Sequence, residues 1–114
     1  MSNFDQQLKK GVLELLILSM ISEKDMYGYE LICEIENKSR GLIYLKEGSL
    51  YPILYRLEDY GYVTVYEVKK EGSKQSKKYY SITDDGKKQL NEWYETWDFF
   101  TKTIYSMLRS DKSE

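Results

Sequence analysis

The fold is decided by Glu47-Gly48-Ser49-Leu50-Tyr51-Pro52-Ile53-Leu54-Tyr55-Arg56-Leu57-Glu58. Four aliphatic residues of this stretch recur at i, i+3, i+4 and i+7, which predicts a helix with one buried stripe. They are Leu50, Ile53, Leu54 and Leu57. We expect this helix over residues 48–60, with Ser49 as N-cap and Gly61 as the stop. Pro52 would then stand in the first turn, where backbone N–H groups have no helical partner.

Two helices are predicted before this stretch. The first, over residues 8–21, is apolar on nearly every side, so we expect it to be buried on two sides, with another copy of the chain covering the second. The second covers residues 27–38, with Leu31 and Ile35 facing inward and either Ile32 or Cys33 beside them.

A hairpin and a long helix are predicted after it. Residues 62–68 and 78–82 are rich in β-formers and flank a Gly/Ser-containing tip over 69–77. A helix over 84–107 would follow, with Thr83 as N-cap. Its apolar residues step by three and four, as in a coiled-coil seam. They are Leu90, Trp93, Trp97, Phe100, Ile104 and Met107.

This order predicts a mostly α fold with a small β-hairpin: a winged helix-turn-helix plus a long C-terminal dimerisation helix. We assign residues 1–83 to the winged helix, 84–109 to the dimerisation helix and 110–114 to a disordered tail.

Composition excludes several classes of site. The chain has 114 residues, no histidine, one cysteine and a net charge of −2. Zinc fingers and histidine-based catalysis are therefore excluded, and no cofactor or enzymatic activity is expected. The longest apolar run is too short to span a bilayer, which favours the cytoplasm. An acidic total means that any nucleic-acid binding depends on a local patch.

The hairpin supplies such a patch. Residues 69–80 hold five lysines against one glutamate, a local charge of +4. A basic wing beside a helix-turn-helix suits the DNA backbone, although a solvated hairpin tip is the plainer alternative. In this fold the start of the second motif helix enters the major groove, and the start of the preceding helix lies near phosphates. The DNA-contacting candidates are Lys10, Tyr27, Tyr29, Gly48, Ser49, Tyr51, Pro52, Tyr55, Arg56, Lys74, Lys77 and Lys78.

Two of these assignments have open alternatives. Arg56 is as well suited to an ion pair with a nearby carboxylate as to DNA. Of Tyr27 and Tyr29, one is expected to bond a phosphate and the other to lie in the core, without a choice between them.

The tryptophan-bearing seam predicts a dimer interface. A flat pocket between Trp97 and its symmetry mate could also stack a planar ligand, although plain dimer packing is the simpler interpretation. The residues expected at this interface or pocket are Leu15, Leu18, Leu90, Trp93, Tyr94, Trp97, Phe100 and Ile104.

Four motifs in this order resemble the PadR family of bacterial transcriptional regulators: residues 13–18, 26–30, 47–58 and 78–83. The resemblance covers roughly residues 8–107 and implies a winged-helix homodimer that represses from a pseudo-palindromic operator. The chain is similar to the short branch of this family, whose members have one C-terminal helix. In multidrug-sensing members of that branch a tryptophan lies in the dimer pore, at the position of Trp97. Trp93, one turn earlier, could fill that pore.

The function expected is therefore a double-stranded DNA-binding repressor, relieved by a small aromatic or drug-like effector. The alternative is a winged-helix module that binds another protein through its last helix, because fold alone does not fix function.

Overall fold

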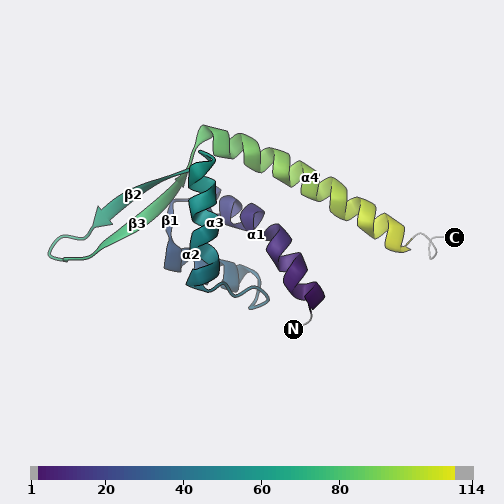
Figure 1. Ribbon diagram of the computed structural model, residues 1–114, viewed down its shortest axis with the longest axis horizontal. Helices are drawn as coiled ribbons and strands as arrows, with labels where there is room; N and C mark the ends of the chain where they lie inside the picture. Colours follow the sequence, from purple (N-terminus) through teal and green to yellow (C-terminus); the bar gives the residue numbers. More distant parts are fainter. Residues whose placement is uncertain (1–2, 110–114) are drawn as a thin grey trace.

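The computed structural model describes residues 3–109 and shows a winged helix with a long C-terminal helix (Figure 1). Helices α1 (Asn3–Glu23), α2 (Gly28–Lys38) and α3 (Glu47–Asp59) form the body together with a small sheet. The predicted tail at 110–114 lies outside the described residues. Within the described part, no helix is both long and apolar enough to cross a membrane.

The sheet has three antiparallel strands in the order β1-β3-β2. They are β1 (Met26–Tyr27), β2 (Val63–Lys69) and β3 (Ser76–Ile82). The two long strands confirm the hairpin, but they extend further than predicted and leave a tip of only residues 70–75. The short β1, which pairs Met26 with Tyr80 and Tyr27 with Tyr79, was not predicted.

The predicted stripe of α3 is fully in the core: Leu50, Ile53, Leu54 and Leu57 are all buried. They pack with Ile17, Leu18 and Ile21 of α1, with Leu31, Ile32 and Ile35 of α2 and with Val63 and Tyr80 of the sheet. On α2 the structure therefore places Ile32, rather than Cys33, in the core.

The end of α3 confirms the predicted glycine stop. Gly61 has a φ of 80°, the Tyr62 N–H donates to the Leu57 carbonyl at 2.9 Å, and the Gly61 N–H donates to Glu58 at 2.9 Å. These two bonds form a Schellman motif, which fits glycine at the left-handed position.

The predicted N-cap of α3, Ser49, was wrong, although the helix starts within one residue of the predicted Gly48. The helix begins at Glu47 with Lys46 as N-cap, and no side chain caps it. Pro52 is therefore the sixth helical residue and lies inside the helix. Its missing N–H leaves the Gly48 carbonyl without its usual i+4 donor. Gly48 is exposed, so solvent can supply the missing hydrogen bond.

Helix α4 (Asp84–Arg109) runs away from the body (Figure 1). Its predicted cap is confirmed, because the Thr83 hydroxyl accepts the Gly86 N–H at 2.9 Å. The same hydroxyl donates to the Gly61 carbonyl at 2.7 Å, which ties the start of α4 to the end of α3. Only Gly86 of this 26-residue helix is buried.

Candidate DNA-binding surface

The first turns of α3 form the exposed end of a helix that is anchored on its other side. Gly48, Ser49 and Pro52 are exposed, while Leu50 between them is fully buried. The Tyr55 side chain, one turn further on, is 55% exposed. The structure therefore brings four of the predicted contacts to one free surface.

Tyr51, another predicted DNA contact, is packed against α2 rather than free at the surface. It is half-buried and packs over Gly28 at the start of α2, where a Cβ would overlap its hydroxyl. Burial is also the main cause that raises the pKa of Tyr51, followed by the nearby Glu47 carboxylate. Tyr51 thus joins the starts of α2 and α3, a role that only Gly28 beside it makes possible.

Arg56 forms an ion pair with a carboxylate, which was one of the two alternatives predicted for it. Its Nη2 lies 3.4 Å from Oε1 of Glu14 on α1. Both side chains are more than a third exposed, so the pair contributes little to stability. A phosphate could therefore compete with Glu14 for this guanidinium.

The wing carries its lysines on two faces. Lys77 and Lys78 are neighbours in β3 and point to opposite sides of the strand, whereas Lys74 lies in the tip. Lys78 is paired in register with Glu67 on β2. The Nζ of Lys77 lies 4.2 Å from the ring centre of Tyr27, which is cation–π distance.

Neither Tyr27 nor Tyr29 belongs to the core, so the expectation that one of them would be buried was wrong. Tyr27 is half-buried on the outer face of the sheet, edge-on to Tyr79 at 5.4 Å. Tyr79 in turn stacks on Tyr66 at 5.7 Å. Tyr29 is exposed on α2.

This row of tyrosines, one from each strand, was missed by the sequence analysis. Tyr27, Tyr79 and Tyr66 are register partners across the sheet. The Tyr66 hydroxyl donates to Oδ2 of Asp25 at 2.6 Å, and this bond is the main cause that raises the pKa of Tyr66. The base of the wing is thereby fixed to the turn between α1 and α2.

The predicted dimer residues gather around a second surface. A groove of about 300 Å³, which we call the tryptophan groove, lies between α1 and α4. It is lined by Leu15, Trp93, Trp97 and Phe100. Leu90 and Tyr94 line a neighbouring hollow with Trp97. The Trp93 ring also makes a T-shaped contact with the Tyr62 ring, with 5.8 Å between the ring centres, and the filling of a pore between two copies by Trp93 stays a prediction. Leu18 differs from the expectation: it is fully buried and lines neither hollow.

The remaining predicted residues are exposed at the margins. Lys10 projects from α1 and borders the tryptophan groove. Ile104 lies two turns beyond Trp97 on α4 and is 38% exposed.

Comparison with known proteins finds the same architecture. The family model described as "Transcriptional regulator PadR-like family" matches residues 17–92. A solved PadR-like transcriptional regulator from Bacillus cereus has a TM-score of 0.77 and 35% identity, over 90% of this chain and 97% of that one.

Two characterised relatives are longer. "Negative transcriptional regulator PadR" of Bacillus subtilis is 30% identical over 72% of this chain and 44% of its own length. "Transcriptional regulator YqjI" of Escherichia coli is 38% identical over 72% of this chain and 37% of its own length. The chain therefore matches less than half of each of these two proteins.

Proposed function

The chain belongs to the PadR-like family of transcriptional regulators, and from this we propose that it is a cytoplasmic repressor that binds a pseudo-palindromic operator as a homodimer. The observation that carries the proposal is the free start of α3 beside a basic wing whose base is fixed by the tyrosine row. One relative is itself named a negative regulator, which supports repression.

The reading surface is small. Four of the 13 residues of α3 are buried in the core, and we assign the contacts with base edges or phosphates to Gly48, Ser49, Tyr51, Pro52, Tyr55 and Arg56. Lys74 and Lys77 add backbone contacts, which strengthen binding without reading sequence. Two such half-sites at a fixed spacing would supply the specificity that one lacks.

The homodimer is supported by the uncovered seam of α4. Trp97, Phe100 and Ile104 are 41%, 58% and 38% exposed, although they continue one apolar stripe. A second copy would cover this stripe and the outer side of α1, where Leu15 and Leu16 are only half-buried. Burial of several such side chains contributes about 1.5–3 kcal/mol each.

The dimer would also bring two tryptophan grooves together. Each groove is lined by Trp93, Trp97 and Phe100, and aromatic side chains suit a planar hydrophobic or drug-like effector. Such a ligand would relieve repression by changing the spacing of the two reading helices. Quenching of tryptophan fluorescence by planar dyes is the expected signal, and unchanged fluorescence with Trp97 accessible would remove this part of the proposal.

The decisive test uses DNA from upstream of the chain's own gene. The unmodified protein should bind it more tightly than a scrambled duplex, with affinity falling steeply as salt rises. Lys74→Glu with Lys77→Glu should weaken binding at least tenfold. Lys87→Glu with Lys88→Glu, which makes the same charge change on exposed residues of α4, should have a much smaller effect.

The same experiment tests the alternative of a protein-binding module. If the wing variant binds DNA as well as the unmodified protein, the wing has no role in DNA binding. If the unmodified protein also fails to prefer its upstream DNA, the interaction module becomes the better interpretation of α4.

A further inference from the structure

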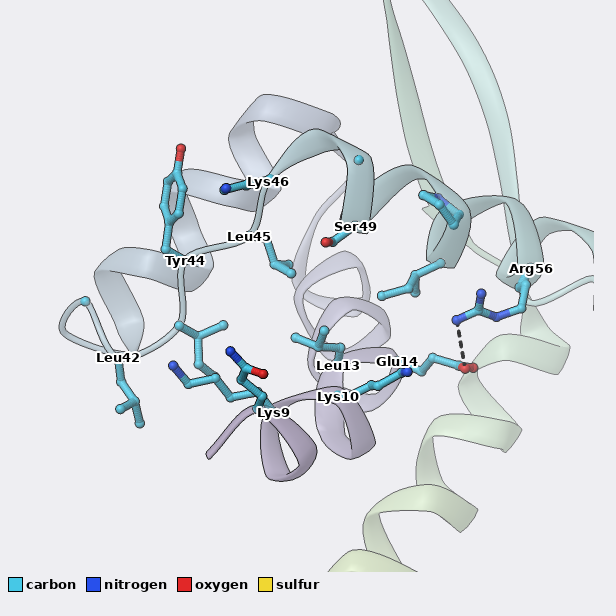
Figure 2. A pocket seen from close by; sticks show the side chains of 16 residues that line it. Lys9, Lys10, Leu13, Glu14, Leu42, Tyr44, Leu45, Lys46, Ser49 and Arg56 are labelled. Atoms are coloured by element: carbon cyan, nitrogen blue, oxygen red, sulfur yellow. Dashed lines mark hydrogen bonds and ion pairs between the residues drawn. The ribbon is translucent and has the colours of Figure 1, made fainter. Parts of the chain in front are cut away.

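A third hollow, larger than the tryptophan groove, lies next to it along the first half of α1, and the two share Lys10 and Glu14. It has a volume of about 680 Å³ and is bounded by the first half of α1, the loop at residues 41–46 and the start of α3 (Figure 2). We call it the α1–α3 groove. Its edge includes predicted DNA contacts (Lys10, Gly48, Ser49, Pro52 and Arg56), whereas its aliphatic interior belongs neither to these contacts nor to the dimer seam.

The rim of the α1–α3 groove is strongly basic. Lys9, Lys10, Lys46 and Arg56 line it, and among the described residues that line it Glu14 is the acidic one. This excess of three positive charges stands against a total of −2 for the chain. In Figure 2, Lys9 and Lys10 extend from α1 at one edge of the groove and Lys46 extends from the loop at the opposite edge, with Leu13 and Leu45 between these edges.

Two of these cations form no ion pair within the described part of the chain. Glu14 is paired with Arg56 at 3.4 Å, whereas Lys10 and Lys46 make no ion pair with any residue that the structure describes. The charge of this rim is therefore complementary to an anion.

The floor of the groove is aliphatic. Leu45 and Ile53 are buried beneath it, and Leu13 and Ile43 form half-buried walls. Its one aromatic side chain, Tyr44, is exposed at the edge. Flat aromatic ligands gain from stacking on rings, which this groove lacks and the tryptophan groove has. An aliphatic tail suits this floor better.

The loop that forms one wall is built by specific backbone bonds. The Ser39 hydroxyl accepts the Ile43 N–H at 2.9 Å, and the Gly41 N–H donates to Glu36 at 2.8 Å. Arg40 and Gly41 both adopt positive φ, of 54° and 82°. A wall fixed before binding lowers the entropy cost of taking up a ligand.

A second copy of α4 is a poor occupant for this groove. From residue 98 onward the described part of α4 carries Lys102 and Arg109 against Asp98 alone. Its exposed apolar end is therefore positive and would meet a positive rim. The groove volume is also within the range of small-molecule sites.

We propose that the α1–α3 groove binds an amphipathic carboxylate, with its head at the basic rim to which Lys10 and Lys46 contribute and its aliphatic tail on Leu13, Leu45 and Ile53. Lys46 caps α3, and Ser49 also lines the groove. Bound ligand would therefore compete with a DNA phosphate at the start of the reading helix. This consequence rests on the proposed DNA binding, whereas the binding site itself does not.

The site is tested by NMR titration of the full chain with decanoate below its micelle-forming concentration. Amide shifts should concentrate in residues 8–14 and 41–56. Acetate, which has the head alone, and decyltrimethylammonium, which has a similar tail and the opposite charge, should each bind at least tenfold more weakly. Equal binding of the cationic amphiphile, or shifts centred on Trp93 and Trp97, would overturn the proposal.

Substitutions make the test specific. Lys10→Glu with Lys46→Glu should weaken decanoate binding at least tenfold, and Leu42→Ser, at an exposed rim position, should weaken it severalfold. Lys87→Glu with Lys88→Glu makes the same charge change away from the groove and should leave binding within twofold. Equal losses in both double variants would show a general charge effect and overturn the site.

A separate arm tests competition with DNA. Decanoate should lower the affinity for the upstream DNA of the unmodified protein, and the decrease should shrink in Leu42→Ser. If decanoate binds the groove but DNA affinity is unchanged, competition is wrong and the site stands. If the protein has no preference for its upstream DNA, the proposed function fails, while the NMR titration still decides the site.

Discussion

Gly28 shows how one missing side chain positions the DNA-facing surface. A Cβ at this residue would overlap the hydroxyl of Tyr51 and lie 2.9 Å from its Cζ. Tyr51 could not then keep its place between the starts of α2 and α3. Glycine is required at position 28 because there is no room for a Cβ. Its backbone conformation does not require glycine, since its φ is not among the positive values found in the chain.

We predict that Gly28→Ala lowers the free energy of unfolding by about 1–2 kcal/mol, because overpacking forces Tyr51 out of its site. In a Tyr51→Phe background the worst overlap is gone, and the same alanine should cost less. A double-mutant cycle from urea unfolding measures this coupling. Equal costs in the two backgrounds would mean that Tyr51 is not what excludes a side chain here.

Tyr80 gives the fold a sensitivity to alkaline pH. It is buried beneath α3, and burial is the main cause that raises its pKa from 10.0 to about 12, followed by Tyr51, Tyr55 and Glu58. The neutral phenol is thus favoured in the folded state. Its contribution to stability is complete below pH 10 and is lost as pH rises through 10 toward 12.

For this reason we predict that Tyr80→Phe reduces the loss of stability between pH 10 and 12 by about 2–3 kcal/mol. Tyr60→Phe, which changes an exposed tyrosine that is not among the groups raising the pKa of Tyr80, should retain the full alkaline loss. Chemical denaturation at pH 8, 10 and 12 compares the three proteins. An equally steep decline in Tyr80→Phe would assign the alkaline loss to other groups.

At the scale of the element, the junction before α4 is the most constrained place in the chain. Thr83 caps the helix and bonds the Gly61 carbonyl, and its own N–H donates to Tyr62 at 3.0 Å. A Cβ on Gly86 would overlap the Tyr62 carbonyl oxygen and lie 2.8 Å from Cγ1 of Ile82. The backbone itself would have to move to make room.

We therefore predict that Gly86→Ala destabilises the protein by about 1–3 kcal/mol. Gly48→Ala is a matched control, because Gly48 is also helical but a Cβ there meets nothing within 4 Å. That change should stabilise by about 0.5–1 kcal/mol through better helix propensity. The comparison uses thermal or urea unfolding, and a neutral Gly86→Ala would contradict the tight junction.

The elements also show where the sequence is informative. The stripe of α3, the Gly61 stop and the Thr83 cap depend on residues within a few positions of one another, so spacing alone predicts them. Strand β1 was missed because two residues carry no period, and their partners Tyr79 and Tyr80 lie more than fifty positions away. The α1–α3 groove was missed for a related reason: its loop wall depends on the backbone of Arg40 and Gly41.

At the scale of the molecule, the chain is elongated, with extents of 67 × 32 × 20 Å. The wing and α4 extend from opposite sides of the body (Figure 1). The wing is stiffened where it leaves the body, whereas the apolar seam of α4 is uncovered. Since the two ends are separate, changes in the seam should alter assembly without altering the local reading surface.

The homodimer proposal makes this separation measurable. Phe100→Lys with Ile104→Lys places two charges in the seam, at side chains that are 58% and 38% exposed in the single chain. The monomer should therefore fold normally. Losing about 1.5–3 kcal/mol for each apolar side chain, on both subunits, should raise the dimer dissociation constant by roughly a thousandfold or more.

Glu95→Lys is the matched control, because it makes the same net charge change of +2 on the opposite face of α4, at an exposed residue that lines neither hollow. Light scattering should find a dimer of the 13.6 kDa chain for the unmodified protein and for this control, and a monomer for the seam variant at micromolar concentration. The monomer should keep weak binding to a single half-site while losing tight binding to the full operator, since the linked second contact is gone. A seam variant that stays dimeric would place the interface elsewhere, and a folded monomer that still binds the full site tightly would separate recognition from assembly.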